Sequence, residues 1–291
     1  MTTFGKRSSS LSPDPEKKAD DGLMPYFPRA AIVGLGLATI AVFAAGTQAA
    51  QTKHWAYEDH GDEVGPAKWG TLPGNAACAT GKQQTPINLA SGIAKPQDLP
   101  NLVFDYKPSN LSMTNNGHTV QMSYDAGSTL GRAGSEAASR STLAQFHFHA
   151  PSEHTVDGAS FPMEAHLVHL NAAGTPVAVV GVFIKAGKEN AGLAKAFQSL
   201  PAKSGDKSAP AGATIDARVL LPADKTFFTY AGSLTTPPCT EGLTWFVLKT
   251  PIEMSTAQIR AFTTLEHLAH TNRPIQNLAG RVVSVDSTPG K

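Results

Sequence analysis

The chain has 291 residues, which is enough for one large domain or two modest ones. Its 24 basic and 23 acidic residues nearly balance, so nothing in the composition points to nucleic acid as a partner. Charged residues make up only 16% while glycine (26) and proline (21) are abundant, which is typical of a strand-rich and loop-rich enzyme rather than a helical bundle.

An uncharged, apolar stretch lies near the N-terminus. Residues 30–46 carry no charge, Arg29 precedes them, and the small residues Thr47 and Ala49 follow. This pattern predicts a secretory signal cleaved after Ala49 or Ala50. The alternative is an uncleaved membrane anchor, although a stretch of this length is at the short limit for spanning a bilayer.

The polar residues 1–29 make an unusually long extension before this stretch, and translation from Met24 would give a signal of ordinary length. We therefore expect three segments: the extension 1–29, a signal region with its cleavage site at 30–50, and one catalytic domain at 51–288. Such a protein would be periplasmic or secreted, with the membrane contacted only through the signal or an uncleaved anchor.

Cys78 and Cys239 are the only cysteines of the chain. In an exported protein such a pair favours a disulfide, whereas two free buried thiols are the alternative if the protein is not exported.

Several short strands are predicted in the first half of the domain. Alternating residues favour strands at 102–106 and 111–114, and a turn at 115–117 brings His118 to the start of a further strand at 119–122. Residues 126–141 are rich in glycine, serine and alanine and are expected to form a loop.

Two histidine-bearing strands follow, at 143–150 and 163–170. Because side chains alternate along a strand, His147 and His149 would project from one face, with the intervening phenylalanines in the core. An antiparallel neighbour could bring His166 to the same point. Three imidazoles without a fourth protein ligand are the arrangement of a catalytic zinc site, which keeps one position open for water.

The remaining elements are predicted from periodicity and turn signals. They are a buried strand at 177–184, a short amphipathic helix at 189–200, an exposed loop at 202–213, strands at 226–231 and 243–248, a helix at 255–268 capped by Ser255, and a final strand near 281–285. No repeat or linker divides them, so we expect a single, mostly β domain.

Taken together, the motifs resemble the α-class carbonic anhydrases in order and approximate spacing. The matching pieces are His54-Trp55-Ala56-Tyr57, Gln84-Thr85-Pro86-Ile87-Asn88, Asn116-Gly117-His118, Gln145-Phe146-His147-Phe148-His149, Ser152-Glu153-His154, Glu164-Ala165-His166-Leu167-Val168-His169 and Ser233-Leu234-Thr235-Thr236-Pro237-Pro238. They cover nearly all of 52–285. The sequence departs from familiar members at Ala150, which replaces a common tryptophan, and in its long N-terminal extension.

The resemblance implies a mainly β (α+β) domain around a central, largely antiparallel ten-stranded twisted sheet with short peripheral helices. It implies a Zn²⁺ cofactor held by His147, His149 and His166. The pair of Cys78 and Cys239 looks like the single disulfide of the bacterial, exported branch, whose members are often homodimers.

Partners for the ligands carry over from the family as well. Gln145 would hydrogen-bond to His147 and Glu164 to His166, and we expect a backbone carbonyl to be the partner of His149. Such partners set the tautomer and the orientation of each ring.

The implied reaction is reversible hydration of CO₂ to bicarbonate and a proton by zinc-bound hydroxide. Thr235 and Glu153 would orient the hydroxide, and His118 would shuttle the proton to buffer. Residues implied to line the substrate pocket are Val168, Val179, Leu234, Thr236, Leu243 and Trp245.

The other histidines are assigned no catalytic role. His154 and His169 are expected to be hydrogen-bonded structural residues, and His60, His267 and His270 to face solvent.

Two other classes of protein share part of this pattern. A cupin-type metal oxygenase would use Glu153 as a ligand, but Ser141 stands where that motif has glycine. A catalytically silent, carbonic-anhydrase-like binding domain would usually lack one or more of the ligand histidines, and this sequence has all three.

Overall fold

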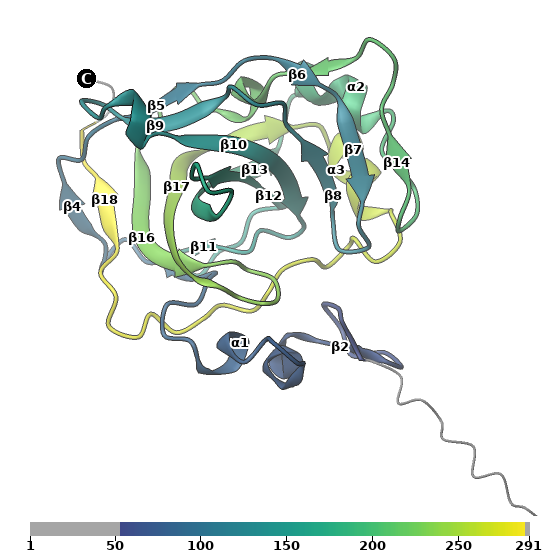
Figure 1. Ribbon diagram of the computed structural model, residues 1–291, viewed down its shortest axis with the longest axis horizontal. Coiled ribbons are helices and arrows are strands. Elements are labelled where there is room, and N and C mark those ends of the chain that lie inside the picture. The colour runs from purple at the N-terminus through teal and green to yellow at the C-terminus, as the bar shows by residue number, and fades with distance from the viewer. Residues whose placement is uncertain (1–52, 289–291) are drawn as a thin grey trace, which may run out of the picture. The chain divides into compact units, whose positions relative to one another are not determined.

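The computed structural model describes residues 53–288 (Figure 1). The predicted extension 1–29 and signal region 30–50 lie outside these residues. Residues 53–288 belong to one unit. Within the described part of this unit, no helix is long and apolar enough to cross a membrane.

A twisted, mixed sheet forms the centre of the domain (Figure 1). Its order is β14 (Lys207–Ser208), β7 (Ser112–Asn115), β8 (Val120–Ser123), β10 (Ser141–His149), β12 (Met163–Leu170), β13 (Pro176–Ala186), β17 (Glu241–Met254), β16 (Phe227–Ser233), β18 (Ser284–Asp286) and β4 (Lys95–Gln97). Off this path, β9 (Thr129–Arg132) pairs with β10 and with β5 (Leu102–Asp105).

The expectation of a mainly β, largely antiparallel sheet is confirmed. Only the β13–β17 and β18–β4 pairs of this sheet, as described in residues 53–288, are parallel. The sheet has twelve strands rather than the expected ten, since β5 and β9 join the ten that follow one another along the path.

Smaller elements surround the sheet. The short strand pairs are β1 (His54–Trp55) with β2 (Glu63–Val64), β3 (Asn88–Leu89) with β11 (Thr155–Val156), and β6 (Ser109–Asn110) with β15 (Thr214–Ile215). The α-helices are α1 (Ala77–Thr80), α2 (Ala194–Phe197) and α3 (Thr256–Thr263), and 3-10 turns span Pro66–Thr71, Ala137–Ser139, Ala191–Leu193 and Ala217–Leu220.

The two faces of the sheet carry different clusters because side chains alternate along each strand. On β10, Phe146 and Phe148 enter the larger core cluster, as predicted. Phe148 makes edge-to-face contacts with Phe197 of α2 and Phe262 of α3, so these helices pack behind the histidine strand. His147 and His149 therefore occupy the opposite face.

Two predicted helices are shorter in the structure. Ser255 does cap α3, through a capping box with Gln258, but the helix ends at Thr263 instead of residue 268. The predicted helix at 189–200 is only the turn Ala191–Leu193 followed by the single-turn α2.

The predicted loop at 126–141 contains strand β9. Leu130 is buried in the core, and the strand pairs with both β5 and the start of β10. Tertiary pairing thus outweighs the weak strand propensity of a glycine- and serine-rich segment. In the same way, β14 within the predicted loop 202–213 forms by pairing with β7.

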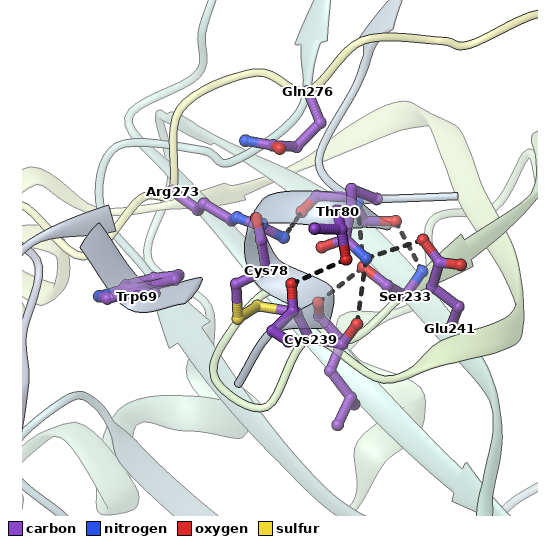
Figure 2. The surroundings of a disulfide bond; sticks show 12 residues. Trp69, Cys78, Thr80, Ser233, Cys239, Glu241, Arg273 and Gln276 are labelled. Atoms are coloured by element: carbon purple, nitrogen blue, oxygen red, sulfur yellow. Dashed lines mark hydrogen bonds between the residues drawn. A yellow bond between two sulfur atoms is a disulfide. The ribbon is translucent and has the colours of Figure 1, made fainter. Parts of the chain in front are cut away.

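The predicted disulfide is present between Cys78 and Cys239, which are separated by 161 positions (Figure 2). It joins α1 to the loop that follows β16. The buried Arg273 reinforces this region, because its guanidinium donates to the carbonyls of Thr85 (2.8 Å) and Cys78 (3.1 Å).

Candidate metal centre

Three imidazoles converge where β10 and β12 pair. His147 lies directly opposite His166 in the antiparallel register, and His149 lies opposite Glu164. Residues paired in this way share a face, so the three rings point to one region. One ring nitrogen from each of His147, His149 and His166 lies within 4.8 Å of the others.

Hydrogen bonds determine which nitrogen of two of these rings is free. His147 Nδ1 donates to Gln145 Oε1 at 2.8 Å, which leaves Nε2. His166 Nε2 donates to Glu164 Oε1 at 3.0 Å, which leaves Nδ1. The predicted partners Gln145 and Glu164 are thus both in contact with the rings.

The third ring is held by the backbone. His149 Nδ1 donates to the Thr271 carbonyl at 2.5 Å, the kind of partner that we expected. Its other nitrogen, Nε2, is buried without a hydrogen-bond partner. A buried polar atom with no partner is costly unless something else binds it.

Burial keeps these imidazoles neutral. It lowers the pKa of His149 to about 4, and it holds the pKa of His147 well below the usual range with help from the two neighbouring rings. Burial also lowers the pKa of His166, against the opposing effect of Glu164. Neutral imidazole is the form that binds a metal ion.

This donor set fits a divalent metal ion such as Zn²⁺. Three neutral nitrogen donors with oriented rings match the protein ligands of a catalytic zinc site. The unpartnered Nε2 of His149 indicates that the site is built for a ligand outside the polypeptide.

Glu164 is itself held in a buried hydrogen-bond network. His154 donates to it from both its backbone nitrogen (2.8 Å) and Nδ1 (2.7 Å), and the Tyr230 hydroxyl lies 2.6 Å from His154 Nε2. Burial alone would raise the pKa of Glu164, but His154 and His166 outweigh it and hold the pKa well below the usual range. His154 therefore has the structural role that we expected.

Glu153 lies beside the three histidines, where its two oxygens have different environments. Oε1 accepts from the Arg273 backbone nitrogen at 2.8 Å, while Oε2 has no hydrogen-bond partner. Oε2 lies 3.6 Å from His149 Nε2 and 3.8 Å from His166 Nδ1. Burial raises the pKa of Glu153 to about 7, although the neighbouring His166 and Thr235 oppose this shift.

An apolar cluster adjoins the metal ligands. Four of the predicted pocket residues belong to this cluster, namely Val168, Val179, Leu243 and Trp245. Leu234 packs against it. The Trp245 indole lies edge-on to His166, with ring centroids 4.8 Å apart. Thr236 is not part of this cluster. Its carbonyl accepts a hydrogen bond from the Cys239 backbone nitrogen in the loop after β16.

His118 lies apart from the ligand cluster. It is half-buried, its ring stacks on Trp55, and its Nε2 lies 3.2 Å from His54 Nε2. Of the other histidines, His169 is buried beside the Tyr106 hydroxyl, whereas His60, His267 and His270 are exposed, as predicted.

A profile of the family described as eukaryotic-type carbonic anhydrase matches residues 64–287. The chain belongs to this family. That membership excludes the cupin alternative.

Bacterial relatives and solved structures agree with this assignment. The chain is 41% identical to a carbonic anhydrase of Pectobacterium carotovorum over 81% of its length and 92% of the relative's. It is 40% identical to one of Neisseria gonorrhoeae, over 89% and 99%. A structure of the α-carbonic anhydrase of Thermovibrio ammonificans with the inhibitor sulfanilamide matches with a TM-score of 0.73 and 41% identity, covering 80% of this chain and 99% of that one.

Sequence reasoning did not identify three contributors to this carbonic anhydrase site. Thr271 holds His149, the Arg273 backbone holds Glu153, and Gly181 gives Glu164 room. The first two act through main-chain atoms, which leave no side-chain signal. Gly181 lies opposite His166 in the β12–β13 register, and a close approach is one reason for glycine inside a buried strand.

Proposed function

We propose that this carbonic anhydrase hydrates CO₂ reversibly to bicarbonate and a proton, with Zn²⁺ held by His147, His149 and His166. The observation that carries the proposal is the convergence of three neutral imidazoles, each with one nitrogen hydrogen-bonded and the other free. When bound, Zn²⁺ would supply the Lewis acidity that makes water a nucleophile at neutral pH.

Glu153 and Thr235 orient the nucleophile. A cation held by the neighbouring histidines favours the ionised form of Glu153, which can only accept hydrogen bonds. Toward this ionised carboxylate the neighbouring Thr235 hydroxyl can only donate. Its oxygen is left to accept from the nucleophile, which directs a lone pair of the nucleophile toward the substrate.

The apolar wall selects the substrate. Val168, Val179 and Leu243 offer no hydrogen-bonding groups from their side chains, and they lie in the same cluster as Trp245. Such a wall suits uncharged CO₂ better than charged bicarbonate, which favours release of the product into water.

His118 accepts the proton that hydration releases. An imidazole can accept a proton at one ring nitrogen and release one from the other, so it can pass a proton from the site to buffer. Its half-buried position between the domain interior and solvent supports this role.

The test is stopped-flow CO₂ hydration by the purified protein, before and after removal of zinc with a chelator. We expect fast hydration that is lost with the metal and restored by Zn²⁺. The His166→Ala variant should lose both zinc and activity. A protein that binds zinc in full and still shows no hydration would instead favour the silent binding domain.

Export to the periplasm or the extracellular space is part of the proposal. The Cys78–Cys239 disulfide supports it, since disulfides persist in oxidising compartments. An intact-mass measurement of the mature protein tests it. A mass starting after Ala49 or Ala50 is expected, and a mass that retains residues 30–46 would indicate an anchor instead.

A further inference from the structure

The central sheet has an open edge at β5. This strand pairs with β9 alone, so its other side has no strand beside it in residues 53–288 (Figure 1). The Ala133 backbone nitrogen donates to the Asn101 carbonyl at 2.8 Å, which directs the main-chain groups of residues 101, 103 and 105 toward β9. The N–H and C=O groups of Leu102 and Phe104 therefore face outward, where another strand could pair with them.

The other two edges of the described sheet are protected against such pairing. At β4, Lys95 and Gln97 turn their main-chain groups toward β18, so Pro96 faces outward and offers no N–H. At β14 the edge is only two residues long and includes Lys207. Short strands, proline and lysine are common means of preventing strand addition. The four residues of β5 include neither proline nor lysine.

A groove of about 950 Å³ runs along the open edge. Residues 101–104 line it in succession, which places the groove beside the strand rather than over one face, because side chains alternate between the two faces. Residues 221–226 line it as well, together with Arg218 and Asp286. A volume of this size is typical of sites that enclose a ligand.

Asp286 supplies a buried carboxylate to this groove. The residue is only 2% exposed, and its Oδ1 accepts from the Thr288 backbone nitrogen at 3.1 Å and from the Thr288 hydroxyl at 3.2 Å. No basic side chain of residues 53–288 forms an ion pair with it. A buried charge is costly unless an opposite charge meets it, so a basic group of a ligand would stabilise this carboxylate.

The other charged groups of the groove attract a ligand less. The carboxylate of Asp224 accepts hydrogen bonds from two threonines, and the guanidinium of Arg218 is paired with Asp216. Lys225 is exposed, and an ion pair at an exposed position contributes little. Asp286 is therefore the charge in the groove that a ligand gains most by meeting.

We propose that this groove binds an extended segment of a partner protein. The segment adds as a strand to β5, forms hydrogen bonds with the main chain of Leu102 and Phe104, and places a lysine or arginine side chain against Asp286. In strand addition the main chain provides affinity and the side chains provide specificity. The groove includes none of the residues that we assign to the metal centre, so this inference does not depend on the proposed function.

The probe is the synthetic peptide Ac-Thr-Val-Lys-Val-Thr-NH₂, added to the zinc-loaded protein. Amide hydrogen exchange measured by NMR reports which main-chain groups become paired. The peptide should slow exchange at Leu102 and Phe104. It should have little effect on Val103 and Asp105, whose amides are already paired with β9. This alternation along the strand distinguishes strand addition from binding over one face.

Variants test the two contacts separately by calorimetric titration with the same peptide. Asp286→Asn removes the charge but keeps an oxygen that can accept from Thr288, and it should weaken binding about tenfold, as expected for loss of one charge-assisted hydrogen bond. Asp105→Asn is the matched control, because it makes the same change on an exposed residue of β5 outside the groove, and it should leave the affinity nearly unchanged.

Phe104→Ala and Phe104→Pro form a second matched pair. Both lose the ring, but only the proline variant also loses the outward N–H group, and proline is tolerated on an edge strand at such a position. Binding should therefore be weaker in Phe104→Pro than in Phe104→Ala.

Several results would overturn the inference. Unchanged exchange at Leu102 and Phe104 would exclude strand addition, and equal affinity for a peptide with glutamate in place of lysine would exclude the role of Asp286. Protection of the two amides that rises with protein concentration, without peptide, would assign the edge to a second copy of the chain. Absence of CO₂ hydration would overturn only the proposed function and leave the peptide result standing.

Discussion

Each imidazole that we assign to the metal has one ring nitrogen in a hydrogen bond to the protein. The chemistry of the partner determines the strength of that hydrogen bond. The charged Glu164 holds His166, the neutral amide of Gln145 holds His147, and the Thr271 carbonyl holds His149. Of the three partners, Glu164 makes the most hydrogen bonds, because it also accepts two from His154. Changes near Glu164 should therefore affect metal binding strongly.

Gly181→Ala should weaken zinc binding without removing a ligand. A Cβ at this position would lie 2.9 Å from Glu164 Oε1, the atom that accepts from His166. Displacing that oxygen should weaken zinc binding by about tenfold or more, the usual effect of disturbing the partner of a ligand. Competition with a chromophoric chelator measures this constant.

Gly92→Ala is the matched control, because a Cβ there meets no atom within 4 Å. Its zinc affinity should equal that of the wild type. Equal affinity in Gly181→Ala would contradict the role that we give to Glu164.

Buried His169 should make the protein sensitive to acid. Burial lowers the pKa of His169 to about 3, against about 6.5 in an unfolded chain. Between these values the unfolded state binds a proton that the folded state does not. The stability contribution is therefore full above about pH 6.5 and is lost as the pH falls toward 3, by up to about 1.4 kcal/mol for each unit.

Urea unfolding of the metal-free protein at pH 7 and pH 5 measures this loss. His169→Gln keeps a group that can hydrogen-bond to Tyr106 but does not titrate, so its stability should fall less over the same interval. Using metal-free protein in both cases removes the contribution of zinc release. An unchanged pH dependence in the variant would assign the acid sensitivity to other groups.

At the scale of elements, the register between β10 and β12 assembles the metal centre. His147 and His166 are directly opposed, and a shift of one residue would turn the histidines of one strand to the other face. Phe146 and Phe148 oppose such a shift, since it would move them out of the core that they form with α2 and α3. The hydrophobic core thus holds the metal ligands in register.

Ser255→Ala should destabilise the domain while leaving the site intact. The Ser255 side chain accepts from the Gln258 backbone, and the Gln258 side chain accepts from the Ser255 backbone. Loss of the cap should cost about 1 kcal/mol in the free energy of unfolding. Zinc affinity should not change, because Phe262 of α3 packs against Phe148, on the face of the ligand strand opposite the histidines.

Denaturant unfolding and zinc competition together test this separation. Ser123→Ala, which removes an exposed hydroxyl from β8, serves as the control and should alter neither quantity. A large loss of zinc affinity in Ser255→Ala would show that α3 also positions the ligands.

At the scale of the whole molecule, the disulfide and Arg273 link distant segments to the loop that carries Thr235. Cys239 lies in that loop, and the Arg273 guanidinium donates to the Cys78 carbonyl (Figure 2). The backbone nitrogen of Arg273 donates to Glu153. These contacts join three parts of the chain: the N-terminal segment, the loop after β16 and the segment after α3. Together these parts hold the two orienting residues, Glu153 and Thr235.

Replacing both cysteines by alanine should lower the free energy of unfolding by about 2–5 kcal/mol, since the bond closes a loop of 161 positions. Turnover should also fall because Thr235 is less firmly held. Zinc content should persist, since the ligands come from β10 and β12. A reductant should destabilise the wild type to a similar extent but leave the variant unaffected, and an effect on both would point to a cause other than the disulfide.

The sequence by itself determined the histidine pattern, the family and the face on which the ligands lie, because alternation along a strand is a local property. The same reasoning placed Ser255 as a cap and paired the two cysteines. The predicted end of α3 lies too far along the chain, and β9 was not predicted. The end of a helix and the formation of a short strand both depend on the segments that pack or pair with them.

Only the tertiary structure decided the contributions of Thr271, the Arg273 backbone and the His54–His118 pair. Each brings together positions far apart in the chain, through main-chain atoms or through an exposed and a half-buried histidine. Main-chain groups are the same in every residue, and an exposed histidine leaves no periodic signal in the sequence. Such contacts become visible only when the folded chain sets them side by side.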